Sequence, residues 1–257
     1  MIDKSKDKKY KFEIQRHFNK KALDYNVEDF IPNCLDQYFR APFDHIIAKY
    51  CKKINDKKIL DYCCGTGINS VIFSKKGAKI TGVDISHKSI QIANKKFKKL
   101  NLKNFKFYKM DAHSLNFKNN SFDIIICYKS MLYLDLNKAF LELKRLIRPN
   151  GKIIILENIS NNFFFHYYRY FKHILNNKNY SKELNKLKIK DLNLANKFFD
   201  YHDVVYFDFF TYFGKIIKDQ FKIKISYELL KFLDNFLLNN LKLKSLSFTT
   251  VIVLKKK

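Results

Sequence analysis

The chain has 257 residues, 47% of them hydrophobic and 16% aromatic, and it carries a formal net charge of +26. Such a composition excludes an intrinsically disordered chain and provides enough apolar side chains for one large domain, or one and a half. No apolar run approaches the roughly 18 residues that a membrane-spanning helix needs, and the first residues lack the apolar stretch of a secretory signal. We therefore expect a cytoplasmic protein without a transmembrane segment.

The positive charge comes almost entirely from lysine, since only five of the 50 basic residues are arginines. Sites that recognise phosphates or bases tend to use arginine, whose planar fork donates two hydrogen bonds at once. Lysine is instead spread along the whole chain beside abundant Asn, Ile, Phe and Tyr, which favours a compositional bias over dedicated RNA binding. The electric field of a protein with this positive charge still attracts any polyanion, and it attracts an anionic membrane surface as well.

The five cysteines include no C-x-x-C pair. Their spacing therefore predicts no zinc site, and reduced thiols are the simplest interpretation. We expect no bound metal.

The first 56 residues read as a helical segment, with Phe12, Ile14, Phe18 and Ala22 at helical spacing. Pro32 interrupts this segment, and residues 42–51 read as a further helix.

From residue 57 onward, predicted strands and helices alternate. The strands are expected at 58–62, 79–84, 105–109, 123–127 and 152–157, and the helices at 67–76, 87–101 and 136–147. Ser86 is the expected N-cap of the second of these helices. The alternation predicts a doubly wound parallel sheet, in which ligands bind at the carboxyl ends of the strands.

A glycine loop follows the first strand, which ends in Asp61 and continues through Cys63, Gly65 and Gly67. The second strand ends in another acidic residue, Asp84. Glycines let the backbone approach a ligand closely, and a carboxylate at the tip of the next strand can accept hydrogen bonds from both hydroxyls of a ribose. The loop lacks the Gly-Lys-Ser/Thr ending of a P-loop, so a nucleoside cofactor is expected instead of a cradled triphosphate.

The order Asp-x-x-x-Gly-x-Gly followed by Val-Asp resembles the first two motifs of class I S-adenosylmethionine-dependent methyltransferases. Residues 109–117 resemble that family's adenine-binding segment, 121–127 its fourth strand, and 142–157 its helix, Pro-Gly turn and fifth strand. The first loop position is usually glycine in the family, and here it is Cys63. The resemblance is to the small-molecule branch of the family.

The resemblance implies S-adenosyl-L-methionine as the cofactor and a seven-stranded, mostly parallel sheet with an antiparallel last strand, N-terminal helices and a helical lid insertion. By the same analogy, Asp111 accepts a hydrogen bond from the adenine amino group and the backbone of Ala112 meets the ring. The implied cofactor-binding residues are Asp61, Cys63, Gly65, Gly67, Asp84, Ile85, Asp111, Ala112 and Cys127.

Four segments are expected: an N-terminal helical cap (1–56), the cofactor-binding core (57–157), an aromatic-rich lid that binds the acceptor (158–215), and C-terminal strands that complete the sheet (216–257). The lid carries two aromatic clusters, at 163–171 and 198–213, and such clusters are usually part of a core. The alternatives are that they cover a pocket for an apolar or aromatic acceptor, or that residues 163–175 rest on a membrane interface. In the last segment the sequence predicts strands at 221–225 and 247–254 with a helix at 227–239.

Catalytic residues are expected to be weakly marked, because a sulfonium methyl group is already activated and the protein mainly aligns the nucleophile and excludes water. His202, next to Asp203, is the candidate general base, although a surface loop histidine is the alternative interpretation. Tyr133 follows the fourth strand, where the family places residues near the methyl group, and is the second candidate. Cys127 lacks the Pro-Cys context of pyrimidine-methylating enzymes and is not expected to act as a nucleophile.

These features together predict an S-adenosylmethionine-dependent methyltransferase that acts on a small-molecule acceptor. An RNA methyltransferase, supported by charge alone, stays open as an alternative. A non-catalytic cofactor-binding scaffold or sensor, supported by Cys63, is the second alternative.

Overall fold

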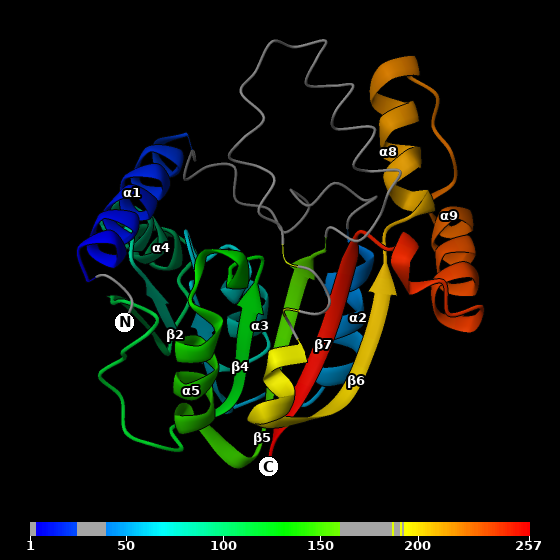
Figure 1. Ribbon diagram of the computed structural model, residues 1–257. Helices are drawn as coiled ribbons and strands as arrows, with labels where there is room; N and C mark the ends of the chain where they lie inside the picture. Colours follow the sequence, from blue (N-terminus) through cyan, green and yellow to red (C-terminus); the bar gives the residue numbers. More distant parts are fainter. Residues whose placement is uncertain (1–3, 25–39, 160–186, 188–190, 192) are drawn as a thin grey trace. The chain divides into compact units, whose positions relative to one another are not determined.

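A computed structural model describes residues 4–24, 40–159, 187, 191 and 193–257 (Figure 1). Seven strands form one mixed sheet in the order β3-β2-β1-β4-β5-β7-β6, with β7 antiparallel. The predicted α/β class and the N-terminal helices are thereby confirmed. The chain divides into a first unit of residues 1–34, 53–153 and 256, and a second unit of residues 35–52, 154–255 and 257.

The first unit holds most of the parallel part of the sheet and the helices that connect it. Its elements are α1 (Lys4–Leu23), β1 (Lys58–Tyr62), α3 (Ser70–Lys75), β2 (Lys79–Asp84), α4 (His87–Lys99), β3 (Phe105–Lys109), β4 (Phe122–Tyr128), the 3-10 helix η3 (Met131–Tyr133), α5 (Leu136–Leu146) and the first part of β5 (Ile147–Asn158). Strands β1, β2 and β3 pair in parallel, and β4 pairs in parallel with β1. All the strands predicted in this region are present.

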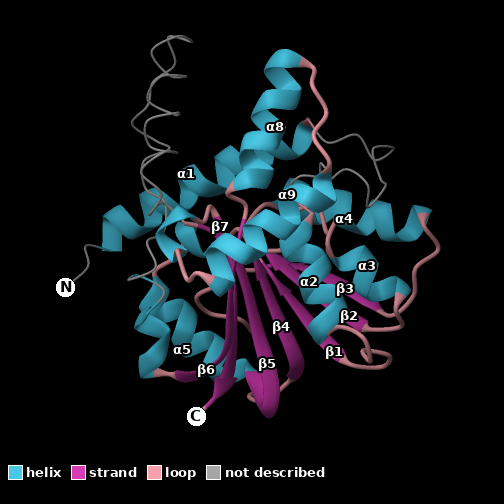
Figure 2. Cartoon of the chain, turned by 90° about the vertical axis from the view of Figure 1, so that its right-hand side faces the viewer, coloured by secondary structure: helices cyan, strands magenta, loops and turns pink. Residues whose placement is uncertain are grey.

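Burial explains why these segments form strands. Residues 59–62 are all buried, as expected for a central parallel strand whose two faces are both covered. Helices α3 and α4 lie against one face of these strands and α5 against the other (Figure 2). Because the strands are parallel, their carboxyl ends meet at one edge, and the loops that follow β1, β2 and β4 gather there.

Two local features fix the geometry of β2 and α4. Gly82 lies so close to Phe107 that an added Cβ would be 2.3 Å from the ring. Ser86 caps α4 as predicted, since its hydroxyl accepts a hydrogen bond from the backbone N–H of Ser89 at 3.1 Å.

The second unit contains α2 (Ala41–Tyr50), the end of β5, the 3-10 helix η5 (Asn193–Lys197), β6 (Phe199–Phe207), α8 (Phe210–Phe221), α9 (Tyr227–Asp234), the π-helix η6 (Asn235–Asn240), the 3-10 helix η7 (Lys244–Leu246) and β7 (Thr249–Lys256). The strand predicted at 221–225 is wrong. Residues 222–226 connect α8 to α9 without joining the sheet, and the sixth strand is β6, which carries part of the second aromatic cluster.

Asp234 organises the helical part of this unit. Its buried carboxylate accepts hydrogen bonds from the backbone N–H groups of Phe209, Phe210 and Thr211, at 3.1, 2.6 and 3.2 Å, and from the Thr211 hydroxyl at 2.7 Å. These N–H groups belong to the start of α8, where no preceding turn can accept them. A residue of α9 therefore caps α8 and ties the two helices together.

Several expectations lie outside the described residues, among them Pro32, Cys34, the aromatic cluster at 163–171 and most of the proposed lid. In the part of the chain that the structure describes, no helix is both long and apolar enough to cross a membrane.

Candidate functional site

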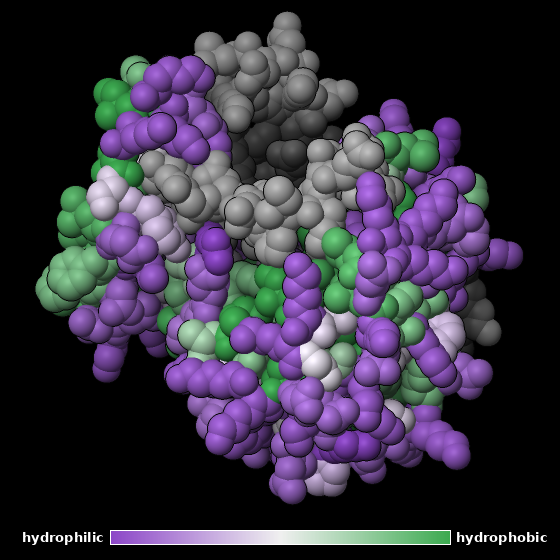
Figure 3. Space-filling model, turned by 180° about the vertical axis from the view of Figure 1, so that it is seen from behind, coloured by the Kyte–Doolittle hydropathy of each residue, from purple (hydrophilic) through white to green (hydrophobic). Residues whose placement is uncertain are grey.

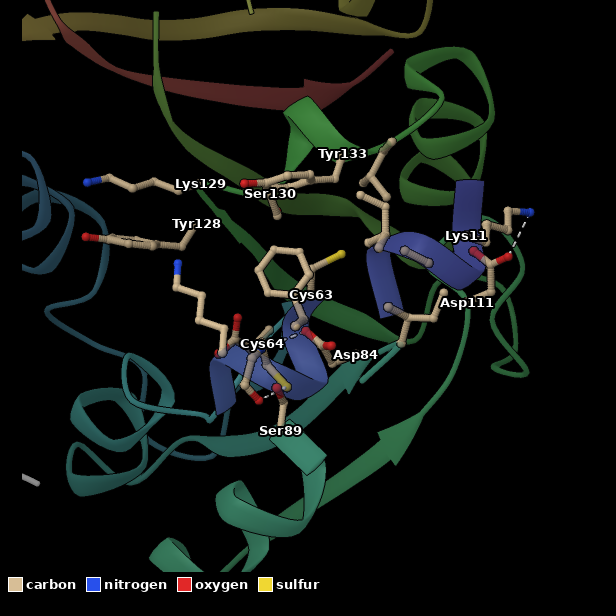
Figure 4. A pocket seen from close by; sticks show the side chains of 18 of the residues that line it. Lys11, Cys63, Cys64, Asp84, Ser89, Asp111, Tyr128, Lys129, Ser130 and Tyr133 are labelled. Atoms are coloured by element: carbon tan, nitrogen blue, oxygen red, sulfur yellow. Dashed lines mark hydrogen bonds and ion pairs between the residues drawn. The ribbon is translucent and has the colours of Figure 1, made fainter. Parts of the chain in front are cut away.

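A cavity of about 470 Å³ lies in the first unit at the carboxyl ends of β1, β2 and β4 (Figure 4). Four segments of the core line it: the loop after β1, the tip of β2, the segment after β3 and the exit of β4. Helix α1 contributes a fifth wall, with the side chains of Ile14, Phe18 and Ala22 at a spacing of four residues. Its volume falls within the range of about 300–1,000 Å³ that small-molecule sites occupy.

The loop after β1 is unusually bent. Cys63, Gly65 and Gly67 have φ angles of +62°, +52° and +68°, in the left-handed region that glycine adopts without strain. The Cys64 N–H donates to the Val83 carbonyl at 2.9 Å, which holds the loop beside β2. The positive φ of Cys63 explains why glycine suits this position.

The two glycines of the loop have different surroundings. A Cβ added at Gly65 would meet no atom of the described residues within 4 Å, so these residues do not fill the space in front of Gly65. A Cβ added at Gly67 would lie 3.1 Å from the Ala93 Cβ and 3.2 Å from the Phe107 ring. Gly65 therefore leaves room for a ligand, whereas Gly67 lets the loop pack on α4 and β3.

Asp84, at the tip of β2, is held by the loop that it faces. Its Oδ2 accepts the Gly65 N–H at 2.8 Å and its Oδ1 accepts the Ser86 N–H at 2.8 Å. Burial raises the pKa of this carboxyl, while the backbone N–H groups of Ser86, Gly65 and Ile85 act in the opposite direction. Each oxygen keeps a further lone pair, so the carboxylate can accept two more hydrogen bonds from a ligand in the cavity.

Asp61 sits deeper, with 3% of its surface exposed. Its pKa is raised to about 7, chiefly by burial, with a smaller contribution from the nearby charge of Asp84 and against the opposing effect of a hydrogen bond from the Ser70 hydroxyl. This contact ties the end of β1 to the first residue of α3. Asp61 therefore stabilises the loop between β1 and α3.

Asp111 and His113, after β3, form a fixed pair. The His113 Nε2 accepts the backbone N–H of Asp135 at 3.0 Å, so in the neutral ring the proton lies on Nδ1, which donates to the Asp111 Oδ1 at 2.7 Å. The Asp111 Oδ2 receives the Lys11 ammonium from α1 at 3.0 Å. The hydrogen bond from His113 holds the pKa of Asp111 well below its usual range, with Lys11 adding to the effect.

Aromatic rings line the remaining wall. Tyr128 and Tyr133, from the exit of β4, both face the cavity (Figure 4). The Tyr133 ring packs edge-to-face on Phe18 of α1, with centroids 5.1 Å apart. Lys129, between the two tyrosines, has a φ of +52° and places its ammonium 5.5 Å from the Tyr128 ring.

Most residues singled out from the sequence gather in this cavity. They are Asp61, Cys63, Gly65, Asp84, Ile85, Asp111, Ala112 and Tyr133. Gly67 is close by but does not line the cavity, and Cys127 is fully buried in β4 away from its surface. The binding roles assigned to all of these residues stay predictions.

His202 is not among the residues that line this cavity; it belongs to β6 of the second unit, where it is exposed. The neighbouring carboxylate that was expected to orient it is engaged by α2: the Asp203 Oδ2 accepts the Lys49 ammonium at 2.6 Å and also the Tyr50 hydroxyl. A role for His202 as general base stays a prediction. Among the described residues there is no group of three or more side chains able to hold a metal ion.

Sequence reasoning missed Lys11, which bridges Asp111 and Asp7 at 3.0 Å from each. No local pattern predicts an ion pair between residues so far apart in the chain. It also missed Lys96 of α4, which is almost fully buried and donates to the Thr66 carbonyl of the glycine loop at 3.1 Å.

Comparisons with known proteins agree with this geometry. Residues 53–222 match the family described as a methyltransferase domain. The chain is 33% identical over 119 residues to a demethylmenaquinone methyltransferase of Thermotoga maritima, covering 45% of this chain and 50% of that protein. It is 30% identical over 162 residues to the enzyme of the same name from Lactococcus lactis, covering 60% of this chain and 62% of that protein. The chain thus spans about half to three fifths of the length of these relatives.

The fold has close counterparts among solved structures. A geranyl diphosphate C-methyltransferase from Streptomyces coelicolor, solved with Mg²⁺, geranyl diphosphate and S-adenosyl-L-homocysteine, superposes with a TM-score of 0.67 at 13% identity, covering 96% of this chain and 98% of that one. At this identity the likeness concerns the fold alone. The matched domain covers well over half of the sequence, and the chain belongs to the methyltransferase-domain family.

Proposed function

We propose that this chain is an S-adenosylmethionine-dependent methyltransferase that uses the cavity of the first unit to methylate a small-molecule acceptor. One observation carries the proposal: the Asp84 carboxylate is fixed at the tip of β2, beside Gly65, whose surroundings leave space that no atom of the described residues fills. A ribose needs a carboxylate in such a place, and the rest of the cofactor needs a backbone without a side chain beside it.

The described residues fit this cofactor. Asp84 would accept hydrogen bonds from the ribose hydroxyls, and Asp111 would accept one from the adenine amino group. The Ala112 carbonyl accepts the Tyr62 hydroxyl at 2.5 Å, so the segment that would meet the adenine ring is anchored to β1. Lys11 and His113 keep the Asp111 carboxyl ionised and fix its orientation, and they are therefore positioning residues.

The bound cofactor supplies an activated methyl group on a positive sulfur. The chain's own contribution is to bind the cofactor, to place the acceptor and to exclude water. Tyr128, Tyr133 and Phe18 present rings to the cavity and suit a flat or apolar acceptor. His113 is a poor choice of general base, because both of its ring nitrogens are already engaged.

The proposed class of acceptor is supported by the side chains that line the cavity and by the names of the related proteins. A cavity walled by rings suits a small molecule better than a nucleic acid backbone, which needs an open basic groove. One lysine of the wall, Lys11, is ion-paired to two carboxylates and so is not available for phosphates. The names of the relatives, demethylmenaquinone methyltransferases, point to small molecules as well.

Isothermal titration calorimetry with S-adenosylmethionine and S-adenosylhomocysteine tests the cofactor assignment. We expect saturable binding by the wild-type chain, a loss of at least tenfold in affinity for Asp84→Asn, since a charged hydrogen-bond acceptor is removed, and no change for Asp200→Asn, an exposed aspartate of β6. Absence of binding, or equal binding by all three proteins, would refute the proposal.

A second experiment separates the acceptor classes. The chain is incubated with tritiated S-adenosylmethionine and either total RNA or a small-molecule extract. Label in the small-molecule fraction supports the proposal, whereas label in RNA alone assigns the RNA alternative. Cofactor binding without transfer to either fraction would favour a scaffold or sensor.

A further inference from the structure

The segment that was wrongly expected to be a strand forms the tip of a helical hairpin. Helices α8 and α9 pack on each other, and apolar and basic side chains alternate over residues 221–225, from the last residue of α8 into the connection to α9. Phe221 is 66% exposed and Ile223 58% exposed, and Lys222 and Lys224 lie beside them, also exposed. A segment with this alternation forms a strand only where a neighbouring strand pairs with it. Here the exposed side chains point into solvent instead.

Helix α9 and the π-helix η6 that follows it directly continue this exposed apolar surface. The inner positions Leu230 and Asp234 of α9 and Leu238 of η6, four residues apart, are buried. On the outer side, Leu229, Phe232 and Phe236 are 52%, 66% and 49% exposed, at a spacing of three and four residues that places them on one face. The helix has therefore built its core contacts with one face and still presents a second apolar stripe.

The clustering is specific to this hairpin. In the described part of the chain, seven of the eleven exposed large hydrophobic side chains fall within residues 221–243, the last two being Leu241 and Leu243. We call the exposed apolar side chains of residues 221–243 the hairpin surface. Figure 3 shows green apolar side chains among purple ones on the side where α8 and α9 lie. Exposed apolar side chains gathered in this way mark an interaction site.

The charge around the hairpin surface is positive. Residues 215–244 contain seven lysines and three acidic residues, and one of the acidic residues, Asp234, is buried in the capping contacts of α8. A second copy of the chain would bring the same positive charge to the contact and repel it. A nucleic acid would pair with the lysines but would leave the leucines and isoleucine without apolar contacts. An anionic lipid surface matches both properties.

We propose that the hairpin surface docks on a membrane that carries anionic lipids. The Phe, Ile and Leu side chains enter the boundary between headgroups and acyl chains, and Lys222, Lys224 and Lys242 lie at the level of the headgroup phosphates. The binding is peripheral and reversible, because the apolar area is small and neither α8 nor α9 is long enough to cross the bilayer. This inference is independent of the methyl transfer proposed above.

Vesicle flotation with the full chain tests the proposal, using phosphatidylcholine vesicles with and without phosphatidylglycerol. We expect binding to the anionic vesicles and at least tenfold weaker binding to the neutral ones. The double variant Ile223→Ser with Phe232→Ser should bind the anionic vesicles at least tenfold more weakly. Its matched control, Leu141→Ser with Phe12→Ser, removes two equally exposed apolar side chains from α5 and α1 and should bind as the wild type does.

Charge variants separate docking from general attraction by a basic protein. Lys222→Gln with Lys224→Gln should weaken anionic vesicle binding by about 30-fold, since each lysine near the surface contributes about 1 kcal/mol. Lys95→Gln with Lys98→Gln, on α4, removes the same charge elsewhere and should have little effect. Equal losses in the two lysine pairs, no binding to anionic vesicles, or a hairpin variant that changes only the oligomeric mass in light scattering would each overturn the proposal.

Discussion

Asp61 should make the protein less stable as the pH rises towards neutrality. The carboxyl is buried beneath the glycine loop, and its pKa in the folded chain is about 7, against 3.8 as the ordinary value for an aspartate. The folded state therefore holds a proton over a range of pH in which the unfolded state has released it. Stability from this group is fully present below about pH 4 and is lost as the pH rises through about 7.

The size of the effect follows from the difference between the two pKa values. About three pH units correspond to about 4 kcal/mol of unfolding free energy. This is an upper value, because a charged group in a buried site relaxes its surroundings. Asp61→Asn is neutral at every pH and so abolishes the loss.

Urea unfolding of both proteins between pH 4 and pH 8 measures the effect. The difference in unfolding free energy, variant minus wild type, should rise by a few kcal/mol between pH 4 and 7 and then level off. Ser70→Ala should shift the wild-type transition to higher pH, whereas Ser74→Ala, which removes a buried hydroxyl of α3 that has no hydrogen-bond partner among the described residues, should not. A difference that is constant with pH, or that falls, would refute the reasoning.

Three further substitutions test other parts of the structure by thermal unfolding. Cys63→Gly should be about 1 kcal/mol more stable than Cys63→Ala, because both lack the thiol and only glycine adopts the φ of +62° without strain; equal stability would contradict this. Gly82→Ala should cost about 1–3 kcal/mol, since its Cβ would lie 2.3 Å from the Phe107 ring, and an unchanged melting temperature would show that the ring moves freely. Asp234→Ala should destabilise the second unit by about 2 kcal/mol through loss of the α8 cap, and a neutral result would mean that water replaces the carboxylate.

The parallel strands were predictable because their signals are local. Strands β1, β2 and β3 are short segments rich in apolar and aromatic residues and bounded by polar turns, and the structure gives them the predicted bounds. Strand β6 was not recognised, because aromatic and apolar residues fall on both of its faces and hide the alternation. The Phe-Lys-Ile-Lys-Ile sequence at 221–225 shows the opposite error: the alternation is present, but no neighbouring strand is available to pair with it.

The candidate site was predictable where its residues follow directly from the ends of predicted strands. Asp84 and Asp111 follow strands that end at the same edge, so topology alone predicts that they converge on one cavity. The ion pair of Lys11 with Asp111 depends on how α1 docks on the core, which no local pattern records. The role of His113 in turning Asp111 likewise depends on the N–H of Asp135, 22 residues away.

A crystal structure of the chain with S-adenosylhomocysteine tests the central claim most directly. The account predicts that the ligand lies in the cavity of the first unit, with both ribose hydroxyls within hydrogen-bond distance of the Asp84 carboxylate and the adenine amino group at Asp111. A ligand bound in another place, or one that turns its ribose away from Asp84, would contradict it.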